Sequence, residues 1–210
     1  MGTLLNRRRY MGGAKGLPYD AEIEYLESTG TQWIDLGFKA TREIDVDIYI
    51  NRSANSIMFD CGAEDGWSSK IARFLIIRND SCYWRFYNGG SAITRSQNLV
   101  GDIRLQGNKT SGIVTNITTG DTYNKNLPSS QDFETTGNFI LFGVTVGSSP
   151  SVESYSSGVR VYSAKITDTG VNLDLIPVRV GQTGYLYDKN SGTLFGNAGS
   201  GTFILGPDKT

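Results

Sequence analysis

Histidine is missing from the sequence, and with it the side chain that proteins use most often as a general base or a metal ligand. Any catalytic site would have to use carboxylates, lysine, tyrosine or cysteine instead. Only two cysteines are present, Cys61 and Cys82, and a single pair does not make a disulfide framework. We expect two reduced thiols, no bound metal and no cofactor.

Long apolar runs and an excess of charge are missing as well. No segment approaches the ~18 apolar residues that a membrane-spanning helix needs. No segment has the hydrophobic stretch of a secretory signal peptide. The net charge is −1, which provides no basic field for nucleic acid. We therefore expect a protein that is made in the cytoplasm and has neither a membrane nor a nucleic acid as its partner.

Proline is scarce where glycine is abundant, with 5 prolines against 26 glycines. This composition favours tight turns between short strands. No stretch of ten or more residues has helical periodicity, whereas alternation at period two recurs. Its clearest instance runs from Glu43 to Ile50, where Ile44, Val46 and Ile48 lie on one face. About a dozen short strands, with turn signals every ~8–12 residues, predict an all-β sandwich.

Three further segments give specific predictions of strands and hairpins. Ala72–Arg78 and Ser81–Tyr87 flank a two-residue turn and predict a hairpin, with Trp84 and Phe86 of its second strand in the core. The segment 138–146 is predicted to form one central strand buried on both faces, followed by a serine-rich loop. The C-terminal segment 176–206 predicts a hairpin and a returning strand that closes the sandwich.

The first 18 residues differ from the rest of the chain. They carry four basic residues and no acid, so the other 192 residues have a net charge of −5. The segment is either an unstructured tail or an extended arm that docks on a partner. We predict a docking arm at 1–18 and one β domain at 19–210. The expected docking residues are Leu4, Leu5, Arg7, Arg8, Arg9, Tyr10 and Met11.

Both ends of the domain resemble a known family. EYLESTGTQWIDLG (24–37), KITDTG (165–170), LIPVRVG (175–181) and GYLYDKNSGTLFGNAGSGTF (184–203) are similar to concanavalin A-like, laminin-G-type jelly-roll domains of bacteriophage and prophage structural proteins. The middle of the chain carries only a general β pattern. The resemblance implies a jelly-roll sandwich of two antiparallel sheets.

The resemblance also implies a role on the virion. We expect a non-enzymatic structural protein that decorates a capsid, fibre or tail and adheres to glycans in the manner of a lectin. Its arm would bind other virion proteins, and the protein would be a homo-oligomer, with a trimer favoured. The same fold also permits a purely architectural subunit without a ligand.

Sugar binding requires a flat aromatic ring beside planar hydrogen-bonding groups. The best candidates in the sequence lie near one loop and along one strand, although their aromatic rings also suit a core or a subunit interface. These residues are Asp65, Trp67, Tyr83, Arg85, Tyr87 and Asn88.

Two acidic patterns offer alternatives. Glu43, Asp45 and Asp47 resemble the carboxylate strand of laminarinase-type glycosidases, which would make Glu43 and Asp47 a catalytic pair. The other interpretation is a solvated strand face. Asp188 and Asn190 resemble the start of a calcium loop, but they also suit a simple hairpin turn, which we favour.

Overall fold

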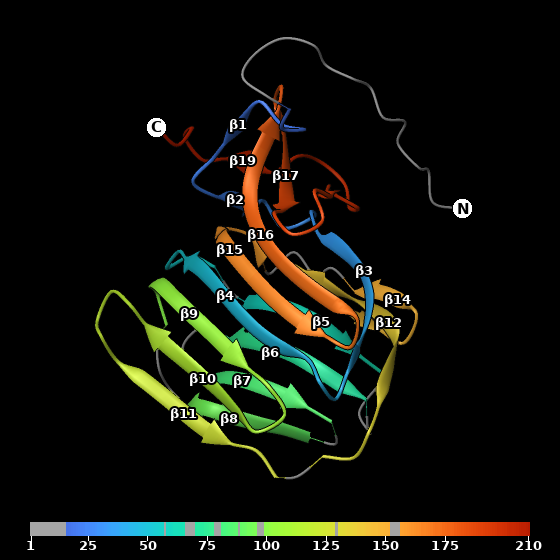
Figure 1. The fold of residues 1–210 in the computed structure, drawn as a ribbon. Helices are drawn as coiled ribbons and strands as arrows, with labels where there is room; N and C mark the ends of the chain where they lie inside the picture. The colour runs from blue at the N-terminus through green and yellow to red at the C-terminus, as the bar shows by residue number, and fades with distance from the viewer. Residues whose placement is uncertain are drawn as a thin grey trace.

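The computed structural model describes residues 16–56, 58–65, 70–77, 81–87, 89–95, 99–128, 130–151 and 156–210. Over these residues the structure is all-β, with 63% of them in strands and 1% in helix. Two sheets pack face to face around one core, as Figure 1 shows. This confirms the all-β class and the two-sheet arrangement. The expected docking residues, which all precede residue 16, lie outside the described residues.

The sheet nearer the viewer in Figure 1, called the front sheet, has eleven strands. Its main path runs β11-β10-β9-β4-β15-β16-β17-β18, while β1, β2 and β19 join it beside β15 and β16. The strands are β1 (Ala21–Glu22), β2 (Leu26–Ser28), β4 (Asp45–Arg52), β9 (Gly101–Gly107), β10 (Ser111–Asn116), β11 (Thr122–Asn126), β15 (Val159–Asp168), β16 (Val171–Val180), β17 (Thr183–Asp188), β18 (Leu194–Phe195) and β19 (Ile204–Leu205).

The second sheet, called the rear sheet, has eight strands. Its path runs β14-β13-β5-β6-β7-β8, and β12 joins β5 to β3. Neighbouring strands are antiparallel except for β13 and β5, which run parallel. The strands are β3 (Ile34–Thr41), β5 (Met58–Glu64), β6 (Ile71–Ile77), β7 (Ser81–Phe86), β8 (Gly89–Arg95), β12 (Glu134–Leu141), β13 (Gly143–Val146) and β14 (Ser149–Ser151).

The core lies between the inner faces of the two sheets. In β4 the alternation confirms the sequence prediction, because Val46, Ile48 and Ile50 are completely buried. In β7 Trp84 and Phe86 are buried as expected. Side chains alternate across a strand, so the residues between these positions point away from the core.

Trp84 joins the two sheets. Its indole Nε1 donates a hydrogen bond to the backbone carbonyl of Asn108 at 2.9 Å. Its side chain lies against Gly107 and Gly112, which are paired across β9 and β10. If Gly107 carried a Cβ atom, that atom would lie 2.7 Å from the Trp84 ring. A Cβ atom on Gly112 would lie 2.5 Å from the Cβ atom of Trp84. The glycine pair therefore leaves a patch without side chains on the front sheet, and the tryptophan of the rear sheet fills it.

The segment 138–146 forms two strands and not the single strand that its pattern predicts. β12 ends at Leu141, Phe142 adopts a φ of 66°, and β13 begins at Gly143. The chain reverses there, so β12 meets β5 antiparallel and β13 runs parallel to it. A continuous apolar run carries no sign of such a reversal, because every residue in it is buried in either arrangement.

Two strands form where the sequence predicts turns or loops. β8 begins at Gly89, in a segment whose two adjacent glycines are typical of a turn. β14 lies in the expected serine-rich loop and pairs with β13. Both strands occupy sheet edges, where only one side needs a partner and a weak strand pattern suffices.

Two further predictions of strand pairing are confirmed. β6 and β7 pair as the predicted hairpin, although its turn lies outside the described residues. β17 and β18 form the predicted C-terminal hairpin next to β16, and β19 is the returning strand, which pairs with β2.

Cys61 and Cys82 are buried free thiols, which confirms the absence of a disulfide. Burial raises the pKa of both thiols far above the ordinary range, so neither is a thiolate at neutral pH. Among the described residues, no helix has the length and apolar character that crossing a membrane requires.

The contact of Trp84 with the glycine pair predicts a specific mutational coupling. Gly107→Ala should lower the free energy of unfolding by about 1–3 kcal/mol, because the new methyl group would overlap the Trp84 ring. In a Trp84→Ala background the same change should cost much less, because the ring atoms that it would overlap have been removed. Urea denaturation of the four proteins measures this coupling.

The matched control is Ser111→Ala, on the neighbouring strand β10, which should change stability by less than about 0.5 kcal/mol. An equal cost of Gly107→Ala in both backgrounds would show that Trp84 does not set the spacing of the sheets.

Candidate functional site

Four of the six predicted sugar-binding residues lie in the described part of the chain. Trp67 and Asn88 lie outside the described residues. Asp65 follows β5, and its carboxylate accepts hydrogen bonds from the backbone N–H and the hydroxyl of Thr136 at 2.9 and 2.7 Å. Glu64 is the last residue of β5 and is buried. Asp65 therefore fastens the end of β5 to β12.

Tyr83 and Arg85 lie on the outer face of the rear sheet, as their alternation with Trp84 predicts. Tyr87 follows the end of β7 with a φ of 54° and packs against the core. Its hydroxyl donates a hydrogen bond to Oε1 of Gln131 at 2.9 Å, and its ring contacts that of Phe133. Tyr87 thus holds the segment that precedes β12.

The middle of this outer face is a network of charges. Nε and Nη2 of Arg73 donate to both carboxylate oxygens of Asp60 at 2.7 and 2.5 Å. Nη1 of Arg73 lies 3.0 Å from Oε2 of Glu64, which also accepts a hydrogen bond from Arg85 at 2.7 Å. Gly62 lies between the two acids and opposite Arg73, so no side chain obstructs the guanidinium. The network thus combines the side chains of two acids with those of two arginines, whose opposite charges are paired.

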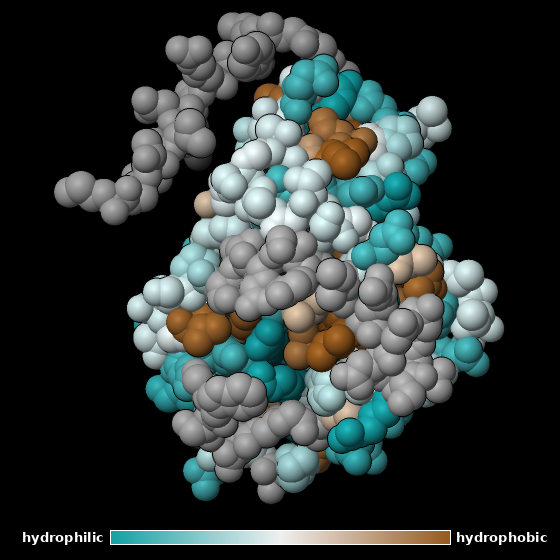
Figure 2. Space-filling model, turned by 180° about the vertical axis from the view of Figure 1, so that it is seen from behind, coloured by the Kyte–Doolittle hydropathy of each residue, from teal (hydrophilic) through white to brown (hydrophobic). Residues whose placement is uncertain are grey.

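Burial decides the protonation of Asp60. Removal from water raises its pKa, the pairing with Arg73 opposes this, and the result is a pKa of about 6 against an ordinary value of 3.8. Figure 2 views the molecule from behind and shows apolar and hydrophilic surface side by side where the rear sheet lies.

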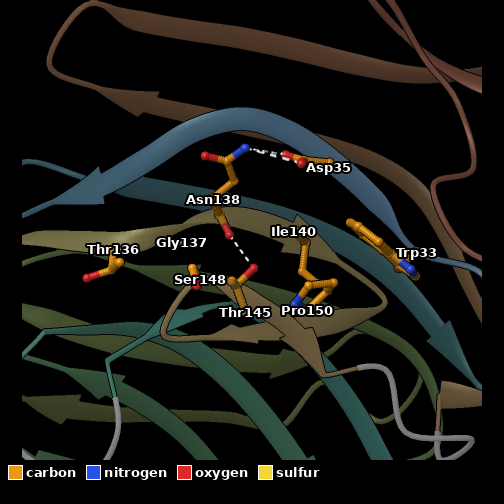
Figure 3. A pocket seen from close by; sticks show the side chains of 9 residues that line it. All are labelled: Trp33, Asp35, Thr136, Gly137, Asn138, Ile140, Thr145, Ser148 and Pro150. Atoms are coloured by element: carbon orange, nitrogen blue, oxygen red, sulfur yellow. Dashed lines mark hydrogen bonds between the residues drawn. The ribbon is translucent and has the colours of Figure 1, made fainter. Parts of the chain in front are cut away.

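A hollow opens at the edge of the rear sheet, where β3 and β12 pass β13 and β14 (Figure 3). Its cavity volume is about 160 Å³. The wall combines an aromatic ring and apolar groups with polar side chains, and the polar residues are the majority. The lining residues are Trp33, Asp35, Thr136, Gly137, Asn138, Ile140, Thr145, Ser148 and Pro150.

Asp35 and Asn138 form a fixed polar pair in this wall. The Asn138 side-chain amide donates to both carboxylate oxygens of Asp35 at 3.0 and 3.2 Å, as the dashed lines in Figure 3 show. The backbone N–H of Gly37 also donates to Asp35 at 2.8 Å. With its NH₂ group directed at Asp35, the Asn138 amide oxygen points elsewhere and can accept a hydrogen bond.

The far wall of the hollow depends on a close approach of two strands. The Thr145 hydroxyl donates to the backbone carbonyl of Asn138 at 2.6 Å. A Cβ atom at Gly137 would lie only 2.0 Å from Cγ2 of Thr145, so only glycine permits this contact. Asp65 holds Thr136, the preceding residue of the same wall. One predicted site residue therefore supports the hollow without lining it.

Sequence reasoning missed the residues of the hollow. Trp33 and Asp35 are half-buried and lie on one side of the chain at the start of β3, because alternate residues share a face. That alternation of an aromatic ring and a carboxylate is visible in the sequence. Asn138 is 103 positions away from Asp35 and joins it only through the pairing of β3 with β12.

The carboxylates of the proposed catalytic pair are bound to cations. Glu43 lies 2.5 Å from Nζ of Lys109, whose hydrogen bond lowers the pKa of Glu43. Asp47 accepts hydrogen bonds from Nε and Nη2 of Arg104 at 2.8 and 2.5 Å. A general acid for glycoside hydrolysis needs a raised pKa. The geometry at Glu43 and Asp47 therefore favours a solvated, ion-paired strand face.

The turn after β17 has the chemistry predicted for a hairpin. Asp188 is completely buried and accepts backbone hydrogen bonds from Asp174, Asn190 and Ser191. Burial alone raises the pKa of Asp188, but these hydrogen bonds outweigh it and hold the pKa below the ordinary value. In the described parts of the chain, no three acidic or cysteine side chains gather as metal ligands would.

No protein-family model, no curated protein and no solved structure matches this chain. Function must therefore be inferred from its own geometry.

The charge network predicts a pH dependence. Because folding raises the pKa of Asp60, the folded state favours its protonated form. This contribution to stability is complete below pH ~4 and is lost as the pH rises through ~6, a change of up to about 3 kcal/mol. Asp60→Asn should remove that part of the pH dependence, measured by urea denaturation at several pH values between about 4 and 7.

The slope of the unfolding free energy against pH is compared between the wild type and Asp60→Asn, because the other acids contribute equally to both proteins. Asp121→Asn, an exposed acid on a turn, should keep the wild-type slope. If Asp60→Asn also kept it, Asp60 would not be titrating with a raised pKa.

Proposed function

We propose that this protein is a bacteriophage virion structural protein that binds a saccharide in the hollow formed by Trp33, Asp35 and Asn138. Three observations support the proposal: the resemblance of both chain ends to phage jelly-roll domains, the all-β fold of two packed sheets, and the chemistry of the hollow. The observation that carries it is the fixed pair of Asp35 and Asn138 beside the Trp33 ring.

A saccharide suits this hollow because its hydroxyl groups donate hydrogen bonds and its C–H faces are apolar. The Asp35 carboxylate and the Asn138 amide oxygen are acceptors that are already held in place, so binding orders few side chains. Trp33, Ile140 and Pro150 supply the apolar wall. The volume of about 160 Å³ is below the ~300–1,000 Å³ of drug-sized sites, so the hollow fits one sugar ring.

The two-sheet fold supports a concanavalin A-like jelly roll, the finer form of the proposal. Residues 1–18 would anchor the protein to another virion component, and residues 19–210 would be displayed. The basic arm and the acidic remainder have opposite charges, so the two parts favour different surroundings. In this arrangement the hollow lies on the displayed domain, where it meets host or mucosal glycans.

A conservative change at Asp35 tests the saccharide site. Asp35→Asn keeps the shape of the side chain and removes its charge, which should weaken binding about 10–100-fold, as expected for a lost charged hydrogen bond. A glycan array identifies the saccharide, and calorimetry measures its dissociation constant with both proteins.

Two further variants locate the site. Asp121→Asn, on a distant turn, should bind like the wild type. Tyr83→Ser tests the sugar-binding residues on β7 that the sequence predicts. Loss of binding in Tyr83→Ser with normal binding in Asp35→Asn would place the sugar on β7. An array without hits, for a protein that still assembles, would support an architectural subunit and contradict saccharide binding.

Deletion of residues 1–18 tests the anchoring role. The domain should keep its fold, because Asp20 and Ile23 are the first residues whose backbone N–H groups pair with β16. Incorporation into particles should fail. Circular dichroism and a particle-incorporation assay measure the two effects. Normal incorporation of the truncated protein would rule out the arm as the anchor.

A further inference from the structure

Three tyrosines lie together on the outer face of the front sheet, on the opposite side of the sandwich from the Asp60 network. Tyr49 is in β4, Tyr162 is in β15 and Tyr25 precedes β2. All three are half-buried. The ladder between β15 and β4 shifts between Val161 and Ser163, so Tyr162 is the extra residue of a β-bulge. A β-bulge changes the direction in which a side chain points, and this bulge places the Tyr162 ring over β4.

The rings form a continuous row. Tyr49 and Tyr162 stack with ring centroids 4.7 Å apart and an interplanar angle of 24°. Tyr25 meets Tyr162 edge to face at 5.8 Å. The guanidinium of Arg160 lies 4.3 Å from the centroid of the Tyr25 ring. The row is therefore held rigid by its own contacts and by a cation.

This packing argues against a saccharide on the row. A sugar stacks on an open ring face, but here a neighbour covers a face of each ring. The row instead presents ring edges and hydroxyl groups. Rigid tyrosines beside arginine are the residues that dominate protein–protein contacts, because they lose little side-chain entropy on binding.

The charges around the row occur in pairs of both signs. Arg160 donates to Glu27 at 2.6 Å, and Arg104 donates to Asp47 at 2.8 Å. Asp102, on the neighbouring strand, accepts from the Asn51 amide at 2.8 Å. A surface that alternates acids and bases can meet a copy of itself after a two-fold rotation, each acid facing a base.

The face is also large enough for a stable contact. The seven strands from β11 to β17 lie side by side in the front sheet. At ~4.8 Å between strands and ~3.4 Å per residue, their face extends roughly 33 Å by 20 Å. This is on the order of 700 Å², close to the ~800 Å² that each partner buries in a standard interface. Figure 1 shows β9, β4 and β15 side by side at the front of the molecule.

We propose that the outer face of the front sheet, centred on Tyr25, Tyr49 and Tyr162, is a two-fold contact with a second copy of this chain. The contact specifies a surface for the homo-oligomer expected from the sequence, but as a dimer. The hollow at Asp35 belongs to the rear sheet, so it stays open in the dimer. The inference does not rest on saccharide binding.

Sedimentation velocity of the full chain over a range of concentrations tests the contact. The wild type should show a monomer–dimer equilibrium. Tyr162→Ser should raise the dissociation constant of the dimer by at least about tenfold, as expected for a residue at the centre of an interface. Tyr83→Ser, the same change at a half-buried tyrosine on the opposite sheet, should leave the dissociation constant unchanged.

A wild type that stays monomeric at every concentration would overturn the proposal, as would a trimer, because a two-fold contact closes at two copies. An unchanged dissociation constant for Tyr162→Ser would place the interface elsewhere. Glycan binding, measured separately on the same proteins, shows whether the saccharide site succeeds or fails independently of the dimer.

Discussion

The insertion of Trp84 between Gly107 and Gly112 is the contact on which the two-sheet arrangement depends. One large ring of the rear sheet fills a patch of the front sheet from which side chains are missing, and its N–H group bonds to the β9–β10 turn at Asn108. Buried aromatic rings supply much of the apolar contact in a core, and close packing fixes the distance between the layers. Once that distance is set, the register of β7 fixes which side chains of the rear sheet face outward.

Three features of the outer surface follow from the way the strands are arranged. Alternation in β7 places Arg85 outward, where it completes the charge network with Asp60 and Arg73. The reversal at Phe142 brings β12 against β13, and the absence of a side chain at Gly137 allows the close approach that shapes the hollow. On the other sheet a bulge turns Tyr162 toward β4. The hollow and the row of tyrosines thus depend on local departures from regular β structure, whereas the charge network depends on regular alternation.

The sequence predicts what depends on neighbouring residues and fails where distant segments meet. The buried face of β4 and the turn at Asp188 follow from local alternation and turn chemistry, and both are confirmed. The hollow does not follow, because Asp35 meets Asn138 only through the pairing of β3 with β12. Likewise, nothing near Asp60 in sequence indicates that Arg73 will lie beside it, since that depends on the register between β5 and β6.

If the saccharide binds beside Trp33, as proposed, the tryptophan side chains report its binding directly. The chain has three tryptophans, so an NMR titration resolves few indole N–H signals, which Trp→Phe variants assign. On addition of the saccharide identified by the glycan array, the Trp33 signal should shift saturably while that of Trp84, buried in the core, stays in place. An unchanged Trp33 signal under conditions where the saccharide is bound would contradict the account.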